Sequence, residues 1–276
     1  MTNIAIPGGS KPELLSLVKE AKAKYGDQLH FFVFDHSENI DTENLWTYIP
    51  CKEEEVVSKA VACVANSEAQ ILLKGIVQTH TLLKEVLKSQ YHLKERALLS
   101  HVAIVDIPKL GRPILLTDAG MNIAPDSVQL SMIITNALSV AKKIGIAHPK
   151  VALLSAAENY NPKMSSSVLA KEVTEHFEGN AKATIFGPLS LDLALSKESV
   201  AHKRFEGPIR GDADILVVPT IDVGNVFYKS LLLFGDTTMG GIIVGTKIPI
   251  VLTSRSDSIK NKLYALEFAL QQLGEG

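Results

Sequence analysis

Residue types that bind anions follow an apolar segment at residues 251–258 (VLTSRSDS) of this 276-residue chain. The segment runs into Ser254, Arg255 and Asp257 just before a predicted helix. Free backbone N–H groups at a helix start, an arginine fork and a hydroxyl group together form a site for phosphate or another oxyanion. The alternative interpretation makes Ser256 or Asp257 a helix N-cap and Arg255 a solvated surface charge. The spacing alone leaves both interpretations open.

Three other loops carry polar residues after apolar segments, where ligands gather in open α/β sheets. A glycine lets a ligand approach the backbone, an amide both donates and accepts, and a lysine neutralises a phosphate. A tight turn or a solvated lysine also explains each motif taken singly. The candidate ligand contacts are Gly224, Asn225 and Lys229 in 219–235, Asp118 and Asn122 in 115–126, and Lys74 in 72–81.

His101 lies within an apolar segment, so we expect a hydrogen-bonded core histidine rather than a catalytic base. The eight histidines form no HxxxH or HExxH motif, and no metal site is expected. The sequence also lacks a Walker-type loop, a GxGxxG after a first strand and a GxSxG elbow. Nucleotide hydrolysis, ordinary Rossmann dinucleotide binding and serine hydrolysis therefore lose their main support.

The composition limits the partners and the compartment. Lys and Arg total 28 against 30 Asp and Glu, so the net charge of −2 favours neither nucleic acid nor an anionic membrane as a partner. Cys51 and Cys63 form no CxxC motif, which is typical of a reducing compartment. The start of the chain does not resemble a signal peptide, and no apolar run approaches the roughly 18 residues needed to span a bilayer. We expect a cytoplasmic protein.

Apolar segments rich in β-branched residues alternate with segments of helical periodicity. This alternation predicts an α/β fold with mainly parallel sheets that helices cover on both faces. The predicted strands are 29–35, 69–75, 101–107, 112–118, 149–155, 182–187, 213–220, 240–246 and 248–254, and the predicted helices are 12–24, 53–66, 79–88, 126–143, 165–177, 223–234 and 257–273.

Two pairs of strands break the alternation, 101–107 with 112–118 and 240–246 with 248–254. Each pair lies too close in sequence for a crossover helix, so each is a hairpin or a passage between sheets. Two breaks placed symmetrically about the middle suggest an inserted domain. We expect an outer domain of residues 1–108 plus 246–276 and an inserted domain of residues 109–245.

Seven segments in this order resemble the phosphate acetyl/butyryl transferase family, most closely its butyryl-transferring members. The resemblance implies two three-layer α/β/α domains with an active-site cleft between them and a homodimer or larger assembly. It also implies the reaction of acyl-CoA with phosphate to give acyl phosphate and CoA, with no cofactor or metal. The segments are ILLKGIVQT (71–79), LLSHVAIVD (98–106), LLTDAGMNIAPD (115–126), PKVALLSAAE (149–158), GPLSLDLAL (187–195), ADILVVPTIDVGNVFYKSL (213–231) and GTKIPIVLTSRSDS (245–258).

The family's Ser-Arg pair falls on Ser254 and Arg255. Arg255 would hold the departing phosphate, and Ser254 would hydrogen-bond the thiol or the developing oxyanion. In acetyl-specific relatives a carboxylate proposed as the base lies about six residues beyond the Arg, where this chain has Asn261. Asp257 is the nearest carboxylate and is either the base or a helix cap.

The resemblance places further residues at the site. Arg96 lies close to the family's basic substrate contact, and the TDAGMN motif puts Asp118 and Asn122 at the cleft. Gly224, Asn225 and Lys229 would position CoA or phosphate. Three alternatives stay open: a phosphate acetyltransferase, a nicotinamide-dependent decarboxylating dehydrogenase and a non-catalytic ligand-binding subunit.

Overall fold

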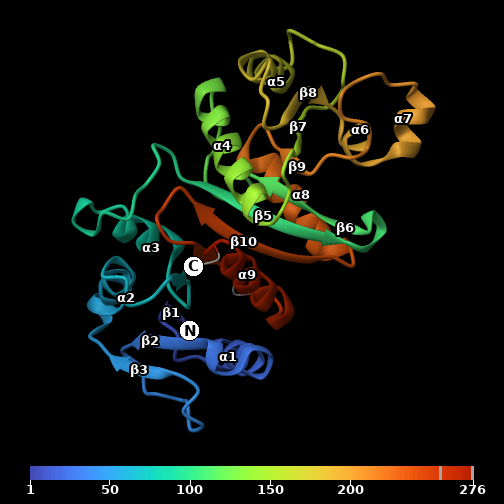
Figure 1. The fold of residues 1–276 in the computed structure, drawn as a ribbon. Helices are drawn as coiled ribbons and strands as arrows, with labels where there is room; N and C mark the ends of the chain where they lie inside the picture. Colours follow the sequence, from blue (N-terminus) through green and yellow to red (C-terminus); the bar gives the residue numbers. More distant parts are fainter. Residues whose placement is uncertain (255–256, 275–276) are drawn as a thin grey trace. The chain divides into compact units, whose positions relative to one another are not determined.

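The computed structural model describes the chain except for residues 255–256 and 275–276. It divides into two compact units, unit 1 of Met1–Ala97 with Gly240–Gly276 and unit 2 of Leu98–Met239. Each unit is described by itself. Figure 1 shows the elements in chain order.

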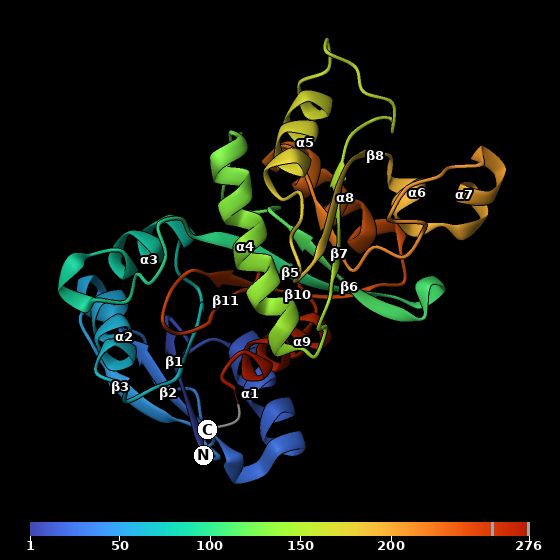
Figure 2. The same ribbon diagram turned by 45° about the horizontal axis from the view of Figure 1, so that its top comes forward.

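Unit 1 is a twisted sheet with helices on both faces. Its strands follow the order β3-β2-β1-β4-β11-β10, and all pairs are parallel except β10 with β11. Helices α1 and α9 pack together on one face, and α2 covers β1, β2 and β4 on the other (Figure 2). The elements are β1 (Thr2–Pro7), α1 (Pro12–Tyr25), β2 (Leu29–Asp35), β3 (Thr47–Pro50), α2 (Val56–Ala65), β4 (Ile71–Leu73), α3 (Thr79–Val86), β10 (Thr238–Val244), β11 (Ile250–Leu252) and α9 (Ile259–Gln271), with short 3₁₀ turns at Gly26–Gln28, Glu53–Glu55 and Ser89–Tyr91.

Unit 2 is built in the same way, with strand order β5-β6-β9-β7-β8. Among these strands the β5–β6 pair is antiparallel, and the other pairs are parallel. Helices α4 and α5 pack against each other and against the sheet. The elements are β5 (Ser100–Ile107), β6 (Arg112–Thr117), α4 (Ser127–Lys143), β7 (Lys150–Leu154), α5 (Ser165–His176), β8 (Thr184–Leu189), α6 (Leu191–Leu195), α7 (Lys197–Lys203), β9 (Ile215–Val217) and α8 (Ile221–Phe234), with a 3₁₀ turn at Pro108–Leu110.

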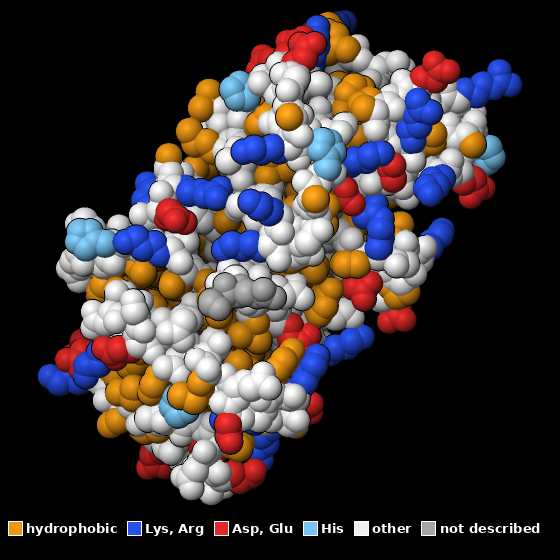
Figure 3. Space-filling view, viewed as in Figure 1, with side chains coloured by type: hydrophobic (Ala, Val, Ile, Leu, Met, Phe, Trp, Pro, Cys, Tyr) orange, Lys and Arg blue, Asp and Glu red, His pale blue; other side chains and the backbone are white. Residues whose placement is uncertain are grey.

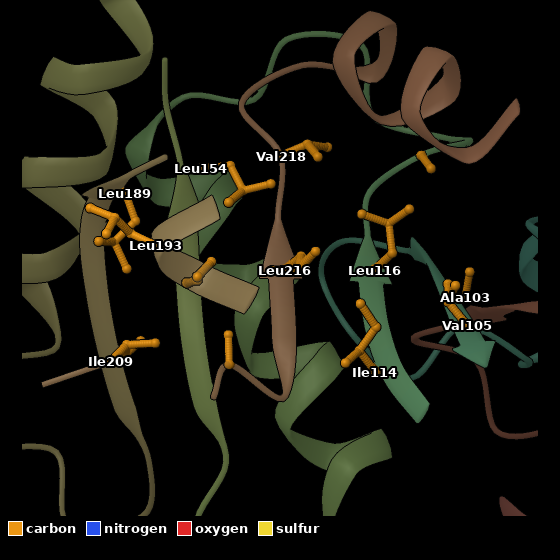
Figure 4. Close-up of a cluster of buried hydrophobic side chains, with 14 of the residues drawn as sticks. Ala103, Val105, Ile114, Leu116, Leu154, Leu189, Leu193, Ile209, Leu216 and Val218 are labelled. Atoms are coloured by element: carbon orange, nitrogen blue, oxygen red, sulfur yellow. The ribbon is translucent and has the colours of Figure 1, made fainter. Parts of the chain in front are cut away.

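Alternate residues of the unit 2 strands form a hydrophobic core under α6 and α8. Ile114 and Leu116 of β6 lie beside Leu216 of β9 in this cluster, and Leu193 of α6 closes it (Figure 4). The intervening residue Leu115 is also fully buried. Because helices cover both faces, successive strand residues are all apolar, and each such side chain contributes about 1.5–3 kcal/mol on burial.

The antiparallel direction of β5 decides which residues share an edge of the unit 2 sheet. Val102 at the start of β5 pairs with Thr117 at the end of β6. The amino end of β5 therefore lies at the carboxyl ends of β6 and β9, the edge where ligands bind in α/β proteins. His101 and Asp118 are brought to the same edge in this way.

The predicted α/β class and mainly parallel sheets are confirmed, and every predicted apolar segment contains a strand. β1, which lies between β2 and β4, was not predicted from the sequence, and neither were β3, α6 and α7. The compact units divide at 97/98 and 239/240, whereas the expected domain limits are 108 and 246. The first difference arises at β5, which pairs with β6 along its length and so belongs to unit 2. The second arises at β10, whose residues Gly241, Ile242 and Ile243 pair with β11 of unit 1.

The surface carries charges of both signs. Lys and Arg side chains share the face shown in Figure 3 with Asp and Glu side chains, as the net charge of −2 leads one to expect. Across the described ranges, no helix is long and apolar enough to cross a membrane.

Candidate active site

The Asp118 carboxylate organises the loop after β6 in unit 2. Asp118 is 3% exposed, and its Oδ1 accepts hydrogen bonds from the backbone N–H groups of Gly120 and Met121, both at 2.9 Å. Its Oδ2 accepts from Asn122 Nδ2 at 2.6 Å and from the backbone N–H of His101 at 3.1 Å. These hydrogen bonds satisfy the buried carboxyl group and tie the loop to β5 through the His101 N–H.

The start of α8 packs directly on this loop. Gly224 has no room for a side chain, since a Cβ there would lie 2.8 Å from Ala119 Cα and 2.9 Å from the Asp118 carbonyl oxygen. Asn225 Nδ2 lies 3.4 Å from the Ala119 carbonyl oxygen, and Asn122 Nδ2 also donates to Leu99 O at 2.9 Å. The structure thus brings together Asp118, Asn122, Gly224 and Asn225, which the sequence had singled out in two separate segments.

Lys229 lies one turn farther along α8. Its Nζ is 5.9 Å from the ring centroid of Tyr228, so the ammonium group lies over an aromatic ring. Tyr228 in turn places its ring edge-on to the His101 ring, with 6.3 Å between centroids.

His101 was expected to be a hydrogen-bonded core histidine, and this expectation is wrong in one respect. The ring is buried, with the residue 8% exposed, but Nδ1 has no hydrogen-bond partner in the described part of the chain. Burial lowers the pKa of His101, and the Asp118 carboxylate opposes part of that shift. A Cβ at Gly120 would lie 3.2 Å from His101 Cγ, so the glycine provides the space for the ring.

In unit 1, Ser254 and Asp257 hydrogen-bond to each other after β11. Asp257 Oδ2 accepts a hydrogen bond from the Ser254 backbone N–H at 2.6 Å, and the Asp257 N–H donates to Ser254 O at 3.2 Å. Helix α9 is capped instead by Ser258, whose Oγ accepts from Asn261 N at 3.2 Å. The interpretation of Ser256 or Asp257 as the N-cap is therefore wrong. Arg255 lies outside the described residues.

Lys74 follows β4 and is buried, with 7% of the residue exposed, so its interpretation as a solvated lysine is wrong. Its Nζ lies 3.4 Å from the Thr253 carbonyl oxygen and 3.5 Å from that of Gly75. Because β4 and β11 are parallel neighbours, Lys74 and Ser254 follow adjacent strands at the carboxyl edge of the unit 1 sheet. An ammonium group is thus held beside the Ser254 loop.

Arg96 lies near the end of the first segment of unit 1. Its backbone N–H donates to Gly245 O at 3.0 Å, next to the bridge that pairs Lys94 with Thr246. Of the described candidates, Lys74, Ser254 and Asp257 lie at the carboxyl edge of the unit 1 sheet. Asp118, Asn122, Gly224 and Asn225 lie at that of the unit 2 sheet. The predicted cleft between the domains stays a prediction.

Comparison with known proteins decides the family. The sequence model described as phosphate acetyl/butaryl transferase matches residues 47–269. The chain belongs to the phosphate acetyl/butyryl transferase family. The family predicted from the seven segments is confirmed, as is the prediction of a phosphate acyltransferase enzyme.

Members of this family with similar sequences carry butyryl, branched-chain or acetyl names, among them a phosphate acetyltransferase of Thermotoga maritima that is 36% identical over 79% of this chain and 75% of its own length. A probable phosphate butyryltransferase of Bacillus subtilis (strain 168) is 45% identical over 79% of this chain and 73% of its own length. A phosphate butyryltransferase of Clostridium acetobutylicum is 36% identical over 98% and 92%. The crystal structure of a branched-chain phosphotransacylase from Enterococcus faecalis V583 is 61% identical, covers both chains fully and superposes with a TM-score of 0.97.

The carboxyl edge of each unit's sheet carries side chains that suit acyl transfer. Unit 1 supplies a serine and a buried lysine, which suit an anionic substrate. Unit 2 supplies a buried carboxylate, two amides and a buried imidazole. No group of three His, Cys, Asp or Glu side chains that could hold a metal ion occurs in the described ranges. The sequence did not predict a role for His101. Strands 101–107 and 112–118 are too close in sequence for a crossover helix, and an antiparallel pairing of the two would have placed His101 beside Asp118.

Proposed function

We propose that this protein moves a butyryl or branched short-chain acyl group between coenzyme A and inorganic phosphate. The observation that carries the proposal is the 61% identity over the full length of both chains with a branched-chain phosphotransacylase. In the direction of acyl-CoA synthesis, the CoA thiolate attacks the acyl phosphate carbonyl while both substrates are bound. Holding the two together removes most of the entropic cost of their encounter.

The unit 1 residues are proposed to bind the phosphoryl end of the substrate. Arg255 holds the phosphate through its two-pronged guanidinium, and Ser254 donates to the thiol or to the oxyanion. Asp257 holds the Ser254 backbone through the 2.6 Å hydrogen bond and is also a candidate base. Lys74 adds positive charge beside Thr253.

The unit 2 residues are proposed to position CoA or phosphate. Asp118 and Asn122 keep the loop after β6 in place, while Gly224 and Asn225 present the start of α8 to the substrate. Lys229 would pair with a CoA phosphate, and Arg96 would serve as a basic substrate contact. No cofactor and no metal are part of this proposal.

The acyl preference is tested by a phosphate-dependent thiol-release assay with acetyl-, butyryl- and isobutyryl-CoA. Each buried methylene contributes up to about 0.8 kcal/mol, so kcat/KM should rise by about fourfold per added carbon. A preference for acetyl-CoA would favour the phosphate acetyltransferase alternative. Thiol release without added phosphate would contradict the transfer to phosphate.

The same protein preparation tests the remaining alternatives. A decarboxylating dehydrogenase would change the absorbance of a nicotinamide cofactor with a hydroxy acid, and a non-catalytic subunit would bind CoA without releasing thiol. Full activity after treatment with a chelator is expected from the metal-free reaction. We expect no absorbance change with a nicotinamide cofactor, and we expect thiol release rather than CoA binding alone.

We also infer a cytoplasmic enzyme that forms a homo-oligomer. Cys51 and Cys63 are both free, which supports a reducing compartment. Helix α8 supports self-association, because it exposes Val223, Val226 and Leu233 at helical spacing, with exposed fractions of 46%, 66% and 73%. An apolar stripe of this kind on one helix is typical of a protein interface.

A further inference from the structure

We propose that His101 is the acid–base residue of the acyl transfer, taking the proton of the CoA thiol and returning it to the departing phosphate. The inference rests on the proposed function and adds to it a group that the family resemblance did not supply. Asn261 stands at the position where the family resemblance would place the base, and an amide cannot accept this proton. Asp257 is the competing candidate, because its Oδ1 is buried without a hydrogen-bond partner in the described ranges.

The position of His101 suits a substrate-facing role. It is the second residue of β5, which runs antiparallel to β6, so it lies at the carboxyl edge beside the Asp118 loop. Asp118 Oδ2 holds its backbone N–H at 3.1 Å, and Thr117 Oγ1 donates to its carbonyl oxygen at 2.8 Å. The backbone of His101 is therefore fixed on both sides of the side chain.

The ring is held in place, but its Nδ1 has no hydrogen-bond partner in the described part of the chain. Gly120 lies under it and Tyr228 meets it edge-on. An unpaired polar atom in a buried position destabilises a fold and is uncommon in native proteins unless it serves a function. Since Nδ1 is shut off from solvent, Nε2 is the nitrogen through which the ring would exchange a proton with a substrate.

The charges around the ring suit both protonation states. Among the described residues, the titratable groups that face the ring are Asp118 from the loop after β6 and Tyr228 from α8, with Lys229 beyond Tyr228. Burial lowers the pKa of His101, so the imidazole is neutral at neutral pH and ready to accept a proton. Once formed, the imidazolium is stabilised by the Asp118 carboxylate.

The proton and electrons balance in a single cycle. The thiol S–H bond breaks and its proton moves to Nε2, while the sulfur electron pair forms a bond to the acyl carbonyl carbon and the carbonyl π pair moves onto its oxygen. That pair then re-forms the carbonyl as the bond from carbon to the phosphoryl oxygen breaks, and the electron pair of the broken bond leaves with phosphate. The imidazolium returns the proton to this oxygen, so phosphate departs as the hydrogen phosphate dianion and His101 is neutral again.

The test measures turnover of butyryl phosphate with CoA as a function of pH for the wild type, His101→Gln and Asp257→Asn. We expect His101→Gln to lower kcat at pH 7 by at least about a hundredfold. Its remaining rate should rise about tenfold per pH unit toward the thiol pKa of about 8.5, because only free thiolate reacts. The wild type should lose activity only as pH falls through the lowered pKa of His101, below about 6.5.

Matched controls separate catalysis from folding and from the proposed function. His148→Gln changes an exposed histidine that contacts Thr184 Oγ1 at 3.2 Å, and its turnover and pH profile should match those of the wild type. His101→Asn replaces His101→Gln if thermal unfolding shows that the Gln variant is not folded. Wild-type turnover in a folded His101 variant overturns the inference, as does a lowered rate with an unchanged pH profile. The rising pH profile in Asp257→Asn instead would assign the proton transfer to Asp257, whereas an inactive wild type would contradict the proposed function itself.

Discussion

The Asp257 carboxylate accepts a hydrogen bond from the backbone N–H of Ser254 at 2.6 Å, and the Asp257 N–H donates back to the Ser254 carbonyl oxygen. The two residues therefore fix each other's position at the carboxyl end of β11. We predict that Asp257→Asn, which keeps an acceptor oxygen, lowers kcat by less than about tenfold, whereas Asp257→Ala lowers it further because the backbone N–H loses a charge-assisted bond. Steady-state kinetics on both variants check this. Equal, large losses in both would mean that the carboxylate itself takes part in proton transfer.

Arg255→Ala is predicted to lower turnover at least about a hundredfold, the scale expected for loss of one preorganised charge stabiliser. Arg255→Lys should recover little of it, because an ammonium group cannot bind phosphate through two parallel hydrogen bonds. The control is Arg210→Ala, which removes an arginine whose Nε donates to Gly207 O at 2.8 Å in an exposed loop. Near-normal turnover of Arg255→Ala would remove Arg255 from the mechanism.

Asp118→Ala is predicted to destabilise the protein as well as the site. The substitution leaves the N–H groups of Gly120, Met121 and His101 without their acceptor. The His101 N–H is buried, so its loss costs about 1–3 kcal/mol, and the two partly exposed groups add to this. We expect the urea midpoint to fall by the equivalent of about 3 kcal/mol. Asn122→Ala is the milder comparison, since it removes only the side-chain donor to Asp118 and Leu99. A wild-type midpoint for Asp118→Ala would show that water replaces the lost bonds.

The two cysteines should differ from ordinary thiols in the native protein. Burial raises the pKa of the Cys63 thiol to about 11 and also raises that of Cys51. Because the thiolate is the reactive form, a disulfide reagent at pH 8 should titrate Cys51 slowly and Cys63 only after unfolding. Counting thiols in native and guanidinium-unfolded protein checks this, with two expected after unfolding. Rapid reaction of both native thiols would contradict the burial of Cys63.

Charge placed on the exposed stripe of α8 should disrupt self-association. Leu233→Lys changes a stripe residue, and Phe234→Lys changes the exposed residue next to it at the end of α8. These side chains are 73% and 86% exposed, so the fold of one chain should not depend on them. We expect both variants to have a lower mass than the wild type in sedimentation measurements, with the thermal unfolding of each chain retained. Tyr160→Lys, at an exposed residue outside α8, serves as the control. A mass unchanged in both α8 variants would place the interface elsewhere.

Local signals predicted much of this fold and of the candidate site. Apolar segments located nine strands because strands covered on both faces have continuous apolar sequences. The residues after those segments, such as Lys74 and Asp118, are at the sheet edge because each strand ends there. β1 escaped this reasoning, since six residues ending in Pro7 resemble a terminal loop. Its place between β2 and β4 depends on pairing partners distant in the chain.

The amino-acid sequence by itself determined the family and the α/β class. Both depend on short segments of characteristic residue types and on the order of those segments along the chain. Only the tertiary structure decided that Ser258 caps α9, that Lys74 is buried and that Nδ1 of His101 has no partner among the described residues. The physical reason is that burial and hydrogen-bond satisfaction depend on what other elements place around a side chain. The direction of one strand, β5, brings His101 to the edge where Asp118 lies.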